Sequence, residues 1–178
     1  MSWLLGQLAA GLRVTGAASV AYLGSVILLA TALVPATLRT VQLFTRNDNG
    51  WLEVVVELLR IVLVVAMIAL GRNWSATDVF AGSQWAAVGR DISHAWRSGW
   101  AGILLQLTVV TALALIFNAA FEYAVTVDRT TTLLAALNVD PAYAHRTTDA
   151  VTFAVKNLIV IPVYLMAMMQ ALHITGTR

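Results

Sequence analysis

The sequence predicts an all-α integral membrane protein, a four-helix bundle with an amphipathic interfacial helix between its second and third spans. Hydrophobic residues make up 60% of the 178-residue chain and charged residues only 11%, whereas soluble domains average ~45–50% and ~25%. The apolar residues gather in four long stretches, and about 20 helical residues cross a hydrocarbon core about 30 Å thick. Helices are expected because they satisfy their own backbone hydrogen bonds in lipid. The four spans are expected at residues 14–38, 52–71, 102–127 and 150–173.

The composition fits a single transmembrane domain, residues 1–178, with no separate soluble domain. The absence of cysteine excludes disulfides, thiolate-bound metals and a cysteine nucleophile. The chain has no basic cluster of the kind that indicates nucleic-acid binding. Ten of the eleven basic residues are arginine, and Lys156 is the exception. This bias favours a GC-rich bacterial genome, and hence a bacterial plasma membrane.

The first span is expected to be a retained helix, because its apolar run is too long for a signal peptide. Four small residues, Ala17, Ala21, Gly24 and Ser25, lie on or beside one face of it. Small residues at this spacing let a second helix approach closely in lipid. We therefore expect a helix-packing face here, which serves either intramolecular packing or a neighbouring subunit.

The connection between the second and third spans predicts an amphipathic helix at about residues 77–98. Trp85, Ile92 and Trp96 lie on its apolar stripe, and Arg90 and Arg97 lie on the polar face. Tryptophan on one face and arginine on the other are typical of a helix lying in the membrane surface. A helix packed against a partner subunit needs the same pattern, so both interpretations stay open.

Six polar residues are expected in one layer of the membrane, because the helices that carry them meet the same leaflet. They are Glu57, Arg60, Asn118, Glu122, Lys156 and Asn157. Glu57 and Arg60 are three residues apart on one helix and can pair. Glu122 and Lys156 lie at similar depth on consecutive antiparallel helices, which predicts an interhelical ion pair.

Two interpretations of this layer remain. Charges within spans are costly and often functional. On this interpretation the layer is a vestibule for ions or protons, or an anchor for a quinone or lipid head group. Alternatively, the pairs neutralise each other and fix helix order. The second is favoured, because none of these residues is expected at the bilayer centre.

The fourth span carries Pro162, which should kink the helix and free a backbone carbonyl near Leu158. Tyr164 or a neighbouring residue is expected to satisfy that carbonyl. His94 and His173 are expected on the same side of the membrane, where two imidazoles can in principle ligate a haem. Solvent exposure is the favoured state of both, so neither a cofactor nor a metal is expected.

With four spans, both termini lie on the side of the 72–99 connection. Five arginines are expected on that side and four on the other, a difference too small for the positive-inside rule to set the orientation. The three arginines of the 72–99 connection, a single short loop, favour cytoplasmic termini. The favoured function is a non-catalytic subunit or assembly partner of a larger membrane complex. Its partners would be membrane lipid and either other membrane subunits or further copies of the chain. The alternatives are a small oligomeric ion or solute channel or transporter and, behind it, a haem- or quinone-binding anchor.

Overall fold

The computed structural model describes residues 2–45 and 50–175, and over these residues the chain is helical, with no strand. Five helical segments are long and apolar enough to cross a membrane. The prediction of an all-α protein is confirmed, and these long apolar helices are consistent with an integral membrane protein. The α-helices are α1 (Ser2–Leu23), α2 (Val26–Thr45), α3 (Gly50–Arg72), α4 (Gly82–Ala124), α5 (Val127–Ala136), α6 (Ala144–Val155) and α7 (Ile161–Ala171). Shorter segments are η1 (Asp78–Phe80), η2 (Pro141–Tyr143) and the π-helix η3 (Lys156–Val160).

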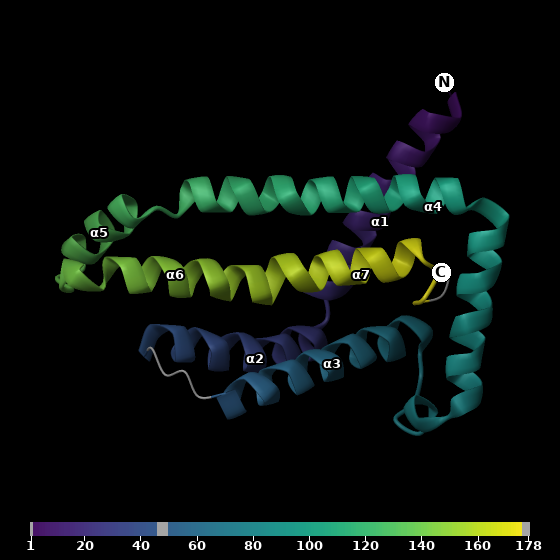
Figure 1. Ribbon diagram of the computed structural model, residues 1–178, viewed down its shortest axis with the longest axis horizontal. Coiled ribbons are helices and arrows are strands. Elements are labelled where there is room, and N and C mark those ends of the chain that lie inside the picture. The colour runs from purple at the N-terminus through teal and green to yellow at the C-terminus, as the bar shows by residue number, and fades with distance from the viewer. Residues whose placement is uncertain (1, 46–49, 176–178) are drawn as a thin grey trace.

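Most of the long helices lie along one common axis, and consecutive ones run in opposite directions (Figure 1). α2 and α3 pack side by side, and α7 packs against α4. α4 bends at Gly99, whose φ of −172° and ψ of 48° are not helical. We call residues 82–98 the first arm of α4 and residues 100–124 its second arm. The second arm runs along the bundle, while the first arm closes one end of it (Figure 1).

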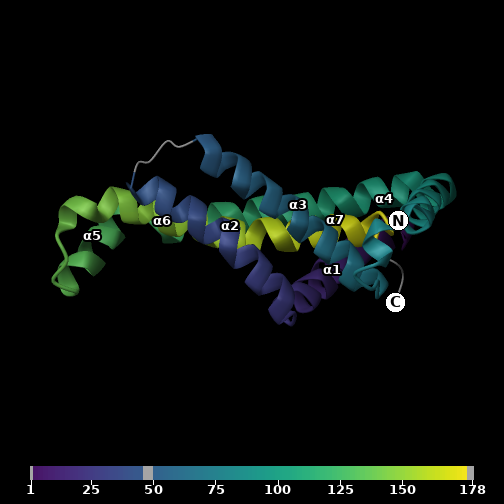
Figure 2. The ribbon, with the colours of Figure 1, turned by 90° about the horizontal axis from the view of Figure 1, so that it is seen from below.

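α1 does not follow the bundle axis. Figure 2 shows it crossing the other helices obliquely, on the side where α7 ends. It packs against α7, α4 and the start of α2. The buried core joins these helices through apolar side chains, among them Ala18, Tyr22, Leu28, Ala32, Leu63, Met67, Val110 and Ala167.

The predicted first span at residues 14–38 is not one continuous helix. The chain turns at Gly24 and Ser25, so α1 ends at Leu23 and α2 begins at Val26. A Cβ atom on Gly24 would lie 2.8 Å from the Val20 carbonyl oxygen, so the turn requires glycine. Ser25 Oγ then accepts a hydrogen bond from the Leu28 amide at 3.3 Å, which caps the start of α2.

The packing face of α1 also differs from the one predicted. Ala17, Ala21 and Gly24 are exposed and Ser25 is half-buried, whereas Gly11, Ala18 and Tyr22 are buried. Gly11 allows the closest approach, because a Cβ there would lie 2.8 Å from Val109 Cβ on the second arm of α4. Small residues of α1 do pack closely against other helices, but these are Gly11 and Ala18, on the stripe beside the predicted one.

The turn before α4 is held by hydrogen bonds to Asp78. Its carboxylate accepts from the Ser75 hydroxyl at 2.6 Å and from the Ser75 amide at 2.8 Å. These two hydrogen bonds lower the pKa of the Asp78 carboxyl below its ordinary value. The predicted helix at about 77–98 therefore starts late, at Gly82, after this turn and η1.

The fourth apolar segment is helical from Ala144, six residues before the predicted start of the span. Its central turn is the π-helix η3, and Pro162 follows directly in α7. Proline lacks the amide that would bond to the carbonyl four residues earlier, which is that of Leu158. Tyr22 Oη fills the place, donating to that carbonyl at 2.6 Å. The freed carbonyl was predicted correctly, but its partner is Tyr22 rather than Tyr164.

Candidate functional site

The predicted polar layer lies where η3 faces α3 and the second arm of α4. A π-helix widens the turn by one residue, and such turns occur frequently at functional sites. Here the wide turn contains Lys156 and Asn157, which bond to two different helices. The layer therefore consists of two polar clusters that share η3.

The first cluster joins α3 to η3. Arg60 forms the predicted ion pair with Glu57 on its own helix. Its second terminal nitrogen, Nη2, donates to Asn157 Oδ1 at 2.6 Å. The Asn157 amide nitrogen in turn donates to the Phe153 carbonyl at 2.9 Å, which fixes the orientation of the side chain. Arg60 is thus held from two directions, by a charge on α3 and by an amide on η3.

The second cluster joins η3 to the second arm of α4. Lys156 Nζ lies 2.5 Å from Glu122 Oε1, which is the interhelical ion pair that the sequence predicts. Asn118 Nδ2, one turn earlier on α4, donates to the same carboxylate oxygen at 3.2 Å. All six predicted residues are therefore brought into contact, but within two clusters rather than one vestibule. Each carboxylate faces a cation, so the arrangement suits charge neutralisation better than ion binding.

A double-mutant cycle on Glu122 and Lys156 tests this structural role. We expect Glu122→Gln and Lys156→Met each to lower the thermal stability of the purified protein, because each leaves the opposite charge without its partner. The double mutant should recover part of the loss, since neither charge remains. The measurement is the melting temperature in detergent micelles. Additive losses would show that the pair does not stabilise the fold, and Thr132→Ala, on the exposed face of α5, is the control.

A third polar cluster, centred on Arg72, was not predicted. Arg72 ends α3, and its side chain is only 11% exposed. Its Nε donates to the Ile174 carbonyl at 2.5 Å, and Nη2 donates to the His173 carbonyl at 3.2 Å and to Asp91 Oδ2 at 2.7 Å. One arginine therefore ties together the ends of α3 and α7 and the first arm of α4. The helix-ending position of Arg72 was visible in the sequence, but its three distant partners were not.

A further ion pair, also not predicted, joins α2 to α3. Arg39 Nη1 lies 2.6 Å from Glu53 Oε1 and also donates to the Gln42 side chain at 2.9 Å. Gln42 is buried, so this contact anchors the hairpin at the end opposite Arg72.

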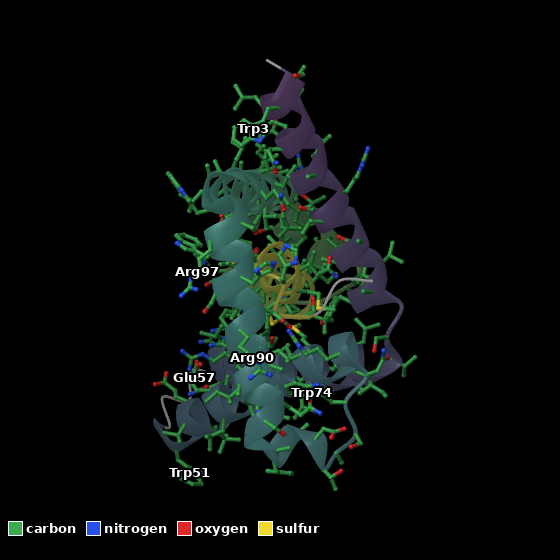
Figure 3. The ribbon with its side chains drawn as sticks, turned by 90° about the vertical axis from the view of Figure 1, so that its right-hand side faces the viewer. Trp3, Trp51, Glu57, Trp74, Arg90 and Arg97 are labelled. Carbon is green, nitrogen blue, oxygen red and sulfur yellow. The ribbon has the colours of Figure 1, made fainter. Side chains whose placement is uncertain are left out.

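The first arm of α4 presents its predicted faces in part. Arg90 and Arg97 are exposed, and Figure 3 shows both on the arm nearest the viewer. Trp96 is 45% exposed and Ile92 is half-buried. Trp85 differs, because its indole nitrogen donates to the Val79 carbonyl at 2.8 Å and its ring contacts Trp74 edge-on at 5.2 Å. Trp85 therefore stabilises the turn before α4, in addition to lying on the first arm of α4.

His94 and His173, the two histidines considered as haem ligands, differ in exposure. His94 is exposed on the first arm of α4, and His173 is half-buried just beyond α7. Within residues 2–45 and 50–175, no group of three or more histidine, cysteine, aspartate or glutamate side chains is placed to hold a metal ion.

Comparison with protein-family models, curated proteins and solved structures found no match to this chain.

Proposed function

We propose that the chain is a non-catalytic integral membrane subunit, or assembly partner, of a larger membrane protein complex. The observation that carries the proposal is the outward face of α1. Only Gly11, Ala18 and Tyr22 of this helix are buried. The N-terminal end of α1, with Trp3, extends past the second arm of α4 (Figure 1 and Figure 3).

The exposed face of α1 combines large apolar side chains with one charge. Leu5 and Leu12 are 60% and 55% exposed. Arg13 is also exposed and makes no ion pair or hydrogen bond with any other residue of the described ranges. A charge within an apolar helix is costly in lipid unless it is paired. A single neighbouring membrane helix that carries a carboxylate would both cover this apolar surface and neutralise the charge of Arg13.

The proposal includes a placement in the membrane. α2, α3, the second arm of α4 and the α6–η3–α7 segment would make four spans, with α1 oblique to them. The first arm of α4 would then lie in the interface, with Trp96 towards lipid and Arg90 and Arg97 towards water. The start of α1 and the end of α7 would lie on that side, which we propose faces the cytoplasm of a bacterial cell. Impermeant maleimide labelling of Ser93→Cys in intact cells would contradict this orientation.

Gentle extraction from the native membrane, followed by native mass spectrometry, tests the assembly. We expect the chain to leave the membrane with other proteins in fixed stoichiometry. Arg13→Glu should reduce their recovery at least tenfold, because it sets a carboxylate against a carboxylate, and a lost charge pair weakens binding strongly. Arg97→Glu makes the same charge change on the first arm of α4 and should leave recovery unchanged.

Two results would contradict the proposal. Extraction of the chain as a closed homo-oligomer, with nothing else in fixed ratio, would favour a channel or transporter instead. Equal recovery of partners with Arg13→Glu and with the unchanged chain would show that α1 is not the docking helix.

A further inference from the structure

A cavity of about 660 Å³ lies between α1, the start of α2 and the ends of α3 and α7. Sites for small molecules measure about 300–1,000 Å³, so the space is large enough for one. Ala17, Ala21 and Ser25 line its α1 side. These residues belong to the predicted packing face, and their small side chains border the cavity where larger ones would fill it.

The described lining of the cavity includes polar side chains with spare hydrogen-bonding capacity. Thr175 is 3% exposed, and its hydroxyl has no hydrogen-bond partner within the described part of the chain. A buried hydroxyl without a partner is costly. Gln170 and His173 also line the cavity, and their side chains make no hydrogen bond to another described residue. Gln106 donates to Gln7 at 2.8 Å, which leaves its own carbonyl oxygen for a ligand.

The rest of the described lining is uncharged and, apart from Ser25, apolar. Leu28, Leu70 and Met166 contribute apolar surface, and among residues 2–45 and 50–175 no aspartate, glutamate, lysine or arginine lines the cavity. The nearby Arg72 is directed to the carbonyls of His173 and Ile174 and to Asp91. A phosphate or carboxylate head group would therefore meet no lysine or arginine from the described part of the chain. This chemistry favours an uncharged ligand with a polar head and an apolar body.

The cavity is bordered by residues on the outer surface of the bundle. Ala17 and Ala21 are exposed, and Leu70 is 37% exposed. In the proposed membrane placement these residues border lipid, which would let a ligand dissolved in the bilayer enter from the side. Its head would reach Gln170, His173 and Thr175, and its tail would remain against the apolar lining.

We propose that this cavity binds one uncharged amphiphile whose head carries carbonyl oxygens. The Thr175 hydroxyl and the Gln170 amide would donate hydrogen bonds to those oxygens, with the His173 imidazole beside them. A prenyl quinone and a neutral glyceride both supply this chemistry. The inference rests on the cavity and on the proposed placement in the membrane, and it does not depend on the proposed partner at α1.

The test uses the full chain in nanodiscs of phosphatidylcholine. Two probes, decylubiquinone and dioctanoylglycerol, are titrated separately, and bound probe is measured by native mass spectrometry and calorimetry. We expect one of the two to bind at one molecule per chain, which identifies the source of the head group. Ala21→Leu should reduce its affinity at least tenfold by filling the cavity. Gln170→Leu should reduce it about tenfold by removing a hydrogen-bond donor.

Controls separate binding from folding. Ala119→Leu makes the same substitution at an exposed position of α4 that does not line the cavity, and it should bind the probe like the unchanged chain. Ala17→Leu is a second cavity-filling variant in case Ala21→Leu fails to fold. Binding of neither probe, or undiminished binding by a folded cavity-filling variant, would overturn the proposal. Retention of a charged phospholipid that Ala21→Leu displaces would overturn it as well.

Discussion

Replacing Arg72 with methionine is expected to lower the free energy of unfolding by about 3 kcal/mol, because charged hydrogen bonds contribute about 1.5–3 kcal/mol each. Methionine keeps the apolar stem but leaves the His173 and Ile174 carbonyls without their donor. It also releases Asp91 on the first arm of α4. The measurement is denaturant unfolding in micelles, followed by tryptophan fluorescence.

Hydrogen exchange locates the effect of this variant. Amides of the first arm of α4 should exchange faster in Arg72→Met, whereas amides of the second arm should not, since Arg72 contacts only the first. Arg90→Met is the matched control, because Arg90 is exposed and forms no ion pair within the described ranges. Unchanged exchange in residues 82–98 would show that Arg72 does not hold this arm to the bundle.

Tyr22→Phe is expected to cost about 1–3 kcal/mol of stability, the penalty for a buried polar group that loses its partner. Tyr22 is fully buried, and its hydroxyl donates to the Leu158 carbonyl at 2.6 Å. Water has little access to replace that donor in the core. Tyr164→Phe makes the same change on α7, where the hydroxyl contact to Thr111 is 3.4 Å long. Its effect should therefore be smaller, and thermal melting in micelles compares the two variants.

Pro162→Ala makes the Tyr22 test specific. Alanine restores a backbone amide at position 162, and this amide can donate to the Leu158 carbonyl in place of the tyrosine. Tyr22→Phe should then cost less in the Pro162→Ala background than in the unchanged chain. An equal cost in both backgrounds would mean that Tyr22 stabilises the core through packing and not through this hydrogen bond.

The parts of the fold that could be predicted depend on local pattern. The second predicted span, 52–71, matches α3 closely because an uninterrupted apolar run ends at Arg72. The ion pairs Glu57–Arg60 and Glu122–Lys156 also followed from spacing along one helix and from equal depth on antiparallel helices. The first distance is set by the geometry of one helix, and the second by the antiparallel order of two consecutive apolar helices.

The parts that were missed depend on tertiary contacts. Glycine and serine occur within apolar helices, so Gly24 and Ser25 alone do not predict the break between α1 and α2. The small side chains of Ala17 and Ala21 are equally compatible with close packing and with the wall of a cavity. Which of the two occurs depends on where α7 lies, and a single sequence does not contain that information. The same holds for Arg72, whose partners lie 19 and about 100 residues further along the chain.

The π-helix η3 has a consequence for how one continuous segment meets its neighbours. An extra residue in a turn rotates everything beyond it by about 100° relative to a regular helix. α6 packs on α2 and α5, whereas α7 packs on α1 and α4. The rotation at η3 gives these two halves independent phases, so each can direct its own apolar stripe to its own neighbours. Deleting one residue from 156–160 would restore a regular helix and force the two halves into a single phase. A shorter and locally more ideal helix would then fit the bundle less well.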